Sequence, residues 1–98
     1  MISYYDLVKK AKPVNKAKKV RFDPLQNIYL ASCHNHLGIE ILGVPSGMLL
    51  TLADGNTTLE EIVKSLGNKL RISEPEIEKG VITEVRNLQR KHLLYCEV

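Results

Sequence analysis

The sequence predicts an α+β domain in which a three-stranded antiparallel sheet is followed by three α-helices, an arrangement like a winged helix-turn-helix. Three observations predict it: alternating apolar residues early in the chain, two later helix-start signals, and a long final stretch with apolar residues at helical spacing. With 98 residues, 44% of them apolar and 26% charged, the chain suits one core. So small a core leaves little room for an enclosed substrate pocket, which argues against a self-sufficient enzyme.

Three short strands are expected first. Val20 and Phe22 lie two residues apart before an Asp-Pro turn, and residues 28–31 are rich in β-forming side chains. After a polar turn, residues 37–42 alternate between apolar and other residues. This spacing places three side chains on one face of the third strand: Leu37, Ile39 and Ile41.

The first helix should open at Pro45, because proline lacks the N–H group that would stay unpaired in a first helical turn. Met48, Leu49 and Leu52 follow at helical spacing. The Asp-Gly pair at residues 54–55 should end this helix, since glycine readily adopts the left-handed conformation found after helices.

The second helix is predicted by a capping box. Thr58 and Glu61 stand three residues apart, the spacing at which each side chain can bond the backbone N–H of the other residue. We expect this helix to run from residue 59 to residue 66 and to end at the Gly-Asn pair of residues 67–68.

The third helix should be the longest. Ser73 and Glu76 repeat the capping-box spacing, and Pro75 lies in the first turn. An apolar stripe then follows at steps of three and four residues, consisting of Ile77, Val81, Val85, Leu88 and His92. At this position His92 is interpreted as a half-buried packing residue rather than a ligand.

Positive charge is concentrated at the start of the chain. Residues 1–21 hold seven Lys or Arg and one acidic residue, a net charge of +6, whereas residues 22–98 carry −3. We therefore expect a basic N-terminal arm over residues 1–18, partly disordered or docked, and a folded domain over residues 19–98. A solvated tail is the simplest interpretation of the arm, and contact with acidic peptide, protein or nucleic acid is the alternative.

Cysteine usage and the absence of a signal segment or membrane span predict a cytoplasmic protein. Cys33, His34 and His36 could bind zinc or copper, but they lie in a predicted turn and no second ligand pair supports them. No phosphate-binding glycine motif or nucleophile motif occurs either. We expect no catalytic residues, no metal and no cofactor.

Residues 44–63, together with a long helix that ends in His92-Leu93-Leu94, resemble the PqqD family. Within this stretch the most telling residues are Asp54-Gly55, Thr58 and Glu61-Ile62, which follow the helix opened by Pro45. PqqD proteins are small peptide chaperones of pyrroloquinoline quinone biosynthesis. They belong to the wider group of RiPP recognition elements, which serve ribosomally synthesised and post-translationally modified peptides. The likeness covers about residues 19–96, and Val44 stands where the family commonly has Asn.

The resemblance implies a non-catalytic recognition protein. Such a protein binds the leader segment of a precursor peptide as a further strand beside the third strand, in the groove formed with the third helix. It then presents the peptide to a modifying enzyme, often of the radical SAM class. Added strands form main-chain hydrogen bonds, which give affinity, whereas neighbouring side-chain pockets give selectivity.

Carried over to this chain, the backbone of residues 38–42 would bond the peptide. Apolar pockets would come from the third strand and the exposed flank of the third helix, and basic residues of that helix would attract acidic leader residues. The expected peptide-binding residues are Leu37, Gly38, Ile39, Glu40, Ile41, Leu42, Lys79, Val81, Val85, Arg86, Leu88 and Arg90.

Two other classes of function remain open. A winged-helix DNA-binding regulator would suit the element order and the basic arm, but residues 74–92 carry four Glu against four Lys or Arg, so the third helix is neutral. A small structural or regulatory subunit would cover its strand edge with its own N-terminal segment or with a second copy, giving a homodimer.

Overall fold

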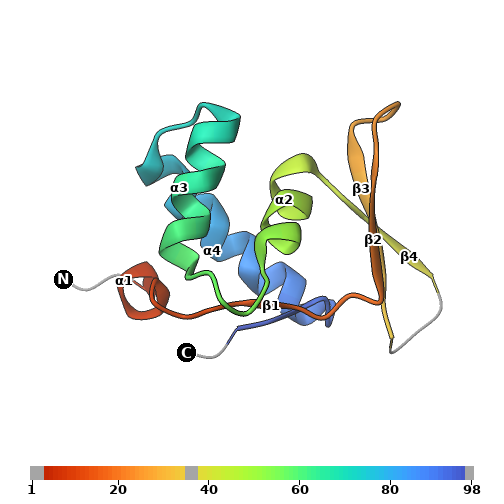
Figure 1. Ribbon diagram of the computed structural model, residues 1–98, viewed down its shortest axis with the longest axis horizontal. Helices are drawn as coiled ribbons and strands as arrows, with labels where there is room; N and C mark the ends of the chain where they lie inside the picture. The colour runs from red at the N-terminus through yellow and green to blue at the C-terminus, as the bar shows by residue number, and fades with distance from the viewer. Residues whose placement is uncertain (1–3, 35–37, 97–98) are drawn as a thin grey trace.

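The computed structural model describes residues 4–34 and 38–96, and a three-stranded antiparallel sheet forms one side of it (Figure 1). The sheet has the order β2-β3-β4, with β2 (Lys19–Asp23), β3 (Ile28–Ser32) and β4 (Ile39–Leu42). Three helices follow in the chain: α2 (Val44–Leu52), α3 (Leu59–Leu70) and α4 (Glu74–Arg90). The predicted α+β class, with this sheet preceding three helices, is confirmed.

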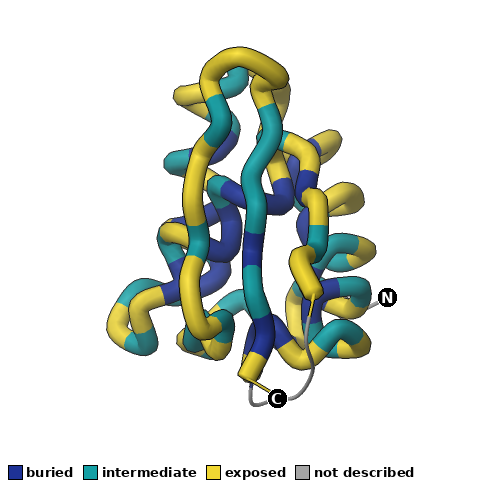
Figure 2. Tube along the Cα trace, turned by 90° about the vertical axis from the view of Figure 1, so that its right-hand side faces the viewer, coloured by how far each residue is buried: buried dark blue, intermediate teal, exposed yellow. Residues whose placement is uncertain are grey.

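The two faces of the sheet differ in burial (Figure 2). Ala31 of β3 pairs with Val20 on one side and with Glu40 on the other, and it is fully buried against the helices. Ile39 and Ile41 of β4 are each 65% exposed. Successive side chains of a strand point to opposite faces, so these two isoleucines share the face turned away from the helices.

Helix α2 packs directly onto the sheet. Pro45 occupies its first turn, as predicted. A Cβ atom at Gly47 would lie 2.1 Å from two ring carbons of Tyr29, so only glycine allows α2 to approach β3 this closely. This contact fixes the position at which the chain leaves β4 and enters the helices.

The capping box at the start of α3 is confirmed. The Glu61 N–H donates to the Thr58 hydroxyl at 3.2 Å, and the Thr58 N–H donates to the Glu61 carboxylate at 3.2 Å. The predicted end at Gly67 is wrong, because α3 continues for another turn and its C-cap is Arg71 in the left-handed conformation, with φ 56°. Gly67 instead permits a close approach, since a Cβ there would lie 3.2 Å from the Ile72 carbonyl oxygen.

Helix α4 is the longest helix described, as expected. Ser73 occupies its N-cap position, but the Ser73 side chain forms no capping hydrogen bond. The buried residues of α4 are Ile77, Val81, Val85 and Leu88. His92 lies beyond the helix, is exposed, and has a φ of 61°. The expectation that His92 packs half-buried on the helical stripe is therefore wrong, because the helix ends at Arg90 and the chain turns.

The N-terminal segment docks across the helices through short elements (Figure 1). It contains α1 (Tyr4–Val8) and β1 (Val14–Asn15), and β1 pairs antiparallel with β5 (Leu94–Tyr95). The Asn15 N–H also donates to the Ala53 carbonyl at 2.8 Å. Val8 is only 2% exposed, so an apolar side chain of this segment belongs to the core.

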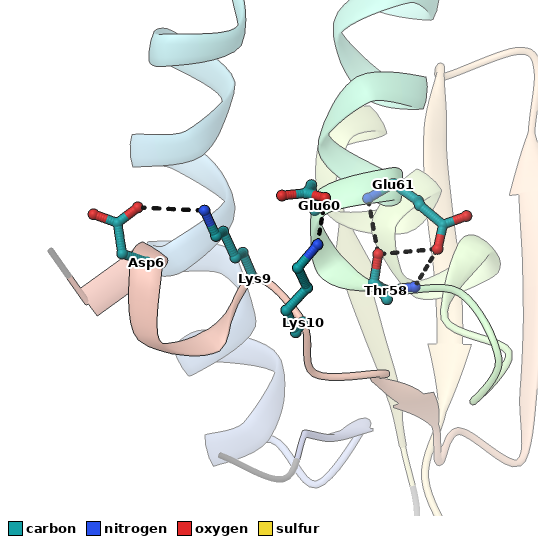
Figure 3. A network of polar contacts seen from close by, with 6 residues as sticks. All are labelled: Asp6, Lys9, Lys10, Thr58, Glu60 and Glu61. Carbon is teal, nitrogen blue, oxygen red and sulfur yellow. Dashed lines mark hydrogen bonds and ion pairs between the residues drawn. The ribbon is translucent and has the colours of Figure 1, made fainter. Parts of the chain in front are cut away.

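The same segment reaches the N-terminus of α3, where Figure 3 shows Lys10 beside Glu60, next to the capping box of Thr58 and Glu61. The Leu59 N–H donates to the Ala11 carbonyl and the Glu60 N–H donates to the Lys9 carbonyl, both at 2.9 Å. Because the capping box already satisfies the next N–H, the first three free donors of α3 are all bonded. Lys10 donates to the Glu60 carboxylate at 3.1 Å, which lowers the pKa of Glu60.

The core lies mainly among the helices and reaches the inner face of the sheet at Ala31 and Leu42. Its largest fully buried side chains include Leu49, Leu50, Leu59, Ile62, Leu66, Leu88 and Leu93. Among the described residues, no helix combines the length and the apolar character needed to cross a membrane.

Candidate functional site

The outer edge of β4 has no partner strand among the described residues, because β4 pairs only with β3. An open edge presents unpaired N–H and C=O groups, and an extended peptide can bond to them. Figure 2 looks onto the sheet from its exposed face, and β4 is the right-hand strand, on the side where helical turns lie behind it. The edge is therefore a candidate binding site.

Two side-chain contacts connect α4 to the chain at and after β4. The Lys91 ammonium lies 3.3 Å from a Glu40 carboxylate oxygen, and the Ser46 hydroxyl donates to the Glu84 carboxylate. A helix turns once in 3.6 residues, so Glu84 and Asn87 lie on one stripe of α4, and the C-cap residue Lys91 continues this stripe. We call β4 together with this stripe, which also includes Gly80, the β4–α4 seam.

A cavity of about 320 Å³ opens where the seam meets the three helices. We call it the apolar pocket, because most of its lining side chains are hydrophobic. Its lining comprises Pro45, Leu49, Leu66, Leu70, Ile72, Glu76, Ile77, Gly80, Val81 and Glu84. Gly80 and Glu84 belong to both the pocket and the seam, so the two features are continuous along α4.

The predicted residues of the third strand occupy different environments. Gly38, Ile39 and Ile41 are exposed, Glu40 is half-buried beside Lys91, and Leu42 is 4% exposed and belongs to the core. Leu37 lies outside the described residues. The structure thus brings the backbone of residues 39–42 to an open edge.

The apolar residues expected on the exposed flank of α4 are instead in the core. Val81 is 5% exposed, Val85 is 3% exposed and Leu88 is fully buried. The rotation of α4 turns this stripe toward α3 and the core, and only Val81 also lines the apolar pocket. This expectation about their exposure is corrected by the structure.

The basic residues expected to attract acidic peptide lie elsewhere on α4. Lys79, Arg86 and Arg90 are exposed. On a helical projection they lie at least roughly a quarter turn from the stripe that faces β4. Their charges can act on a bound peptide through solvent, but their side chains do not line the seam.

Sequence reasoning missed the stripe of α4 on the side of α2 and β4, namely Gly80, Glu84, Asn87 and, just after the helix, Lys91. Their spacing of four, three and four residues forms a second stripe beside the apolar one, and this signal is present in the sequence. Its significance depends on which flank of α4 faces the sheet edge, and only the packing of α4 determines that.

Cys33 and His34 of the predicted metal-binding candidates lie in different environments. Cys33 is buried, and its thiol donates to the Lys91 carbonyl at 3.5 Å, whereas His34 is exposed and lines a separate surface cavity of about 490 Å³ with His92. His36 lies outside the described residues. Among residues 4–34 and 38–96, no three His, Cys, Asp or Glu side chains are grouped so that they could hold a metal ion.

The second cysteine is also a packing residue. Cys96 is 6% exposed, and burial raises the pKa of its thiol. A raised pKa decreases the fraction of the reactive thiolate at neutral pH. Cys96 therefore has the environment of a structural cysteine.

No protein-family model matches the chain, and no curated protein matches it in sequence. Among solved structures, it is similar to the PqqD truncation of Methylobacterium extorquens PqqCD, a solution NMR structure described as a functional and stand-alone RiPP recognition element. The TM-score is 0.68 at 23% sequence identity, and the match covers 85% of this chain and 87% of that chain. The resemblance to the PqqD family is therefore confirmed at the level of the fold.

Proposed function

We propose that this chain is a non-catalytic recognition protein that binds the leader segment of a ribosomally made precursor peptide. The leader adds as a strand to the open edge of β4, beside α4, and the chain presents it to a modifying enzyme, of the radical SAM class. One observation carries the proposal: in the part of the chain that the structure describes, the outer edge of β4 has no partner strand and its Glu40 is paired with Lys91 at the end of α4, in a fold similar to that of a RiPP recognition element.

The energetics of such a site are adequate. A micromolar dissociation constant requires about −8 kcal/mol. Each strand hydrogen bond contributes roughly 1 kcal/mol net, and each buried apolar side chain contributes about 1.5–3 kcal/mol before ordering costs. Hydrogen bonds to four residues of β4, together with the burial of two or three peptide side chains, therefore suffice for micromolar binding without a cofactor.

The roles within the site follow from the positions of its residues. The backbone of β4 provides affinity for any extended peptide. Selectivity comes from Glu84, Asn87 and Lys91, which lie on the seam, while Lys79 and Arg90 act at longer range on acidic leader residues. Leu37 and Gly38 come directly before β4, and we propose that they extend the bonded segment.

Calorimetric titration with short precursor peptides encoded beside the gene tests this proposal. Binding is expected with a dissociation constant below about 100 µM. An added strand bonds through alternate residues, so single N-methylation along the peptide should abolish binding at every second position within the bonded segment. Absence of binding to every neighbouring precursor peptide, or N-methyl sensitivity without this period of two, would contradict the proposal.

A matched pair of variants links the binding to the seam. Asn87→Arg places a long side chain on the stripe facing β4 and should weaken peptide binding about tenfold or more. Asn68→Arg makes the same substitution at an exposed position of α3, away from the seam, and should change peptide binding less than about twofold. Equal effects of the two substitutions would show that the seam is not the binding surface. No observation favours the DNA-binding alternative.

A further inference from the structure

We infer that the apolar pocket is a selectivity subsite that accepts one large apolar side chain of the bound peptide, with a Lys or Arg residue next to it. This inference rests on the proposed peptide-binding function and adds to it the chemistry of the ligand. Neither the fold similarity nor the open strand edge specifies which side chains the peptide carries.

The position of the pocket makes it accessible to a peptide on β4. The chain leaves β4 at Leu42 and, three residues later, Pro45 lines the pocket. A strand that pairs with β4 and continues past its end therefore runs toward the pocket mouth. Because Gly80 and Glu84 line the pocket and also belong to the seam, the peptide need not cross another element to reach it.

The size and lining of the pocket determine the apolar part of the ligand. Its volume of about 320 Å³ is at the lower end of the range for small-molecule sites and accommodates one large side chain. Leu49, Leu66 and Ile77 provide an aliphatic lining and are themselves buried. A Leu, Met or Phe side chain would replace water against these walls.

The charges at the pocket determine which kind of residue stands next to the apolar side chain in the peptide. The two ionisable residues in the lining are Glu76 and Glu84, and both are acidic. Glu84 is half-buried and accepts a hydrogen bond from the Ser46 hydroxyl, while Glu76 is exposed. Two carboxylates beside an apolar cavity complement a cation that stays at the surface while the adjacent apolar residue is buried.

Gly80 allows the pocket to be filled without disturbing the fold. A Cβ at Gly80 would meet no atom within 4 Å, so a larger side chain can project into the cavity from α4. Gly80→Leu places an apolar side chain in the pocket, and Asn68→Leu is the control, because it adds leucine at an exposed position of α3 that does not line the pocket. Glu84→Gln removes the charge while keeping the shape of the side chain.

The experiment selects binders from a display library of random peptides of about 12 residues, using the full chain as bait. Selected peptides are expected to share a large apolar residue with Lys or Arg within two positions of it. Replacing that apolar residue by alanine, or using the Gly80→Leu protein, should weaken binding about tenfold or more. Asn68→Leu should bind as the unmodified chain does.

The charge component is tested on the same peptides. Replacing the basic residue by Gln should weaken binding about fivefold on the unmodified chain and have little effect on the Glu84→Gln protein. The inference is overturned if selected peptides show the N-methyl periodicity of an added strand but no apolar-basic pair, or if Gly80→Leu binds them unchanged. A library that yields no binders contradicts the peptide-binding function itself.

Discussion

The Lys91 ammonium nitrogen lies 3.3 Å from a carboxylate oxygen of Glu40, and this ion pair connects the C-terminal end of α4 to the open edge strand β4. At the other end of the seam, the Ser46 hydroxyl bonds the Glu84 carboxylate. The first contact holds the end of α4 to β4 and the second holds α4 to α2, and the backbone edge of β4 has no partner strand in the described part of the chain.

Exchanging the charges of the ion pair tests its contribution. The side chains of Lys91 and Glu40 are 40% and 32% exposed, so solvent screens their attraction. We expect Lys91→Glu and Glu40→Lys each to lower the urea midpoint, and the double exchange to restore it, with a coupling energy of about 0.2–1 kcal/mol. The coupling should shrink in about 0.5 M NaCl. A coupling energy of zero at low salt would show that the pair does not hold α4 to β4.

The two N-caps of α3 and α4 should respond differently to alanine. Thr58 forms a capping box with Glu61, whereas the Ser73 side chain forms no capping hydrogen bond. Thr58→Ala should therefore destabilise the fold by about 1 kcal/mol, and Ser73→Ala by less than about 0.5 kcal/mol. Urea unfolding of both variants measures the difference, and equal losses would contradict the assigned hydrogen bonds.

Two helical glycines should respond in opposite directions to the same substitution. A Cβ at Gly47 would lie 2.1 Å from ring atoms of Tyr29, so Gly47→Ala forces α2 away from β3 and should cost about 2 kcal/mol or more. Gly80 faces open space, so Gly80→Ala should stabilise the fold by up to about 1 kcal/mol. In thermal unfolding, the midpoint temperature should fall for Gly47→Ala and rise for Gly80→Ala. A stable Gly47→Ala protein would mean that the sheet and α2 are not in close contact.

The turn after α2 should make stability depend on pH. Backbone N–H groups of Asn56 and Thr57 donate to Asp54, each at 2.8 Å, and they lower the pKa of this carboxyl below its ordinary value of 3.8. A lowered folded-state pKa gives stability that is present above the unfolded pKa and is lost as the pH falls through the folded one.

Asp54→Asn isolates this charge, because the neutral amide resembles the protonated acid in shape. The unmodified chain should be more stable than the variant at about pH 6, and the gap should close as the pH falls below the unfolded pKa of Asp54. Urea unfolding of both proteins across this range measures the gap. A gap that does not vary with pH would contradict the role of the Asp54 charge.

The order of strands and helices could be predicted because each boundary has a local cause. Pro45 sets the start of α2, and the Thr58–Glu61 pair sets the start of α3. The end of α3 could not be predicted, since Gly67 is usable both as a helix stop and as a site of close approach. Only the position of the Ile72 carbonyl, 3.2 Å from where a Cβ of Gly67 would be, decides between them.

The candidate site could be predicted only in part. Alternation placed Ile39 and Ile41 on one face of a strand, but the sequence does not state which strand lies at a sheet edge. The periodicity of α4 identified Val85 and Leu88 as apolar stripe residues without showing that the core buries both of them. The sequence also contains the adjacent stripe through Glu84 and Lys91, but only the tertiary packing places this stripe on the side of β4.

Amide hydrogen exchange of the complex with a bound precursor peptide tests the central claim most directly. The sheet has two outer edges, β2 and β4, so the unbound edge serves as an internal control. We predict that alternate amides of residues 39–42 become protected when the peptide binds, while the amides of β2 are unchanged. Protection along β2, or binding without new protection in β4, would contradict strand addition at the β4 edge.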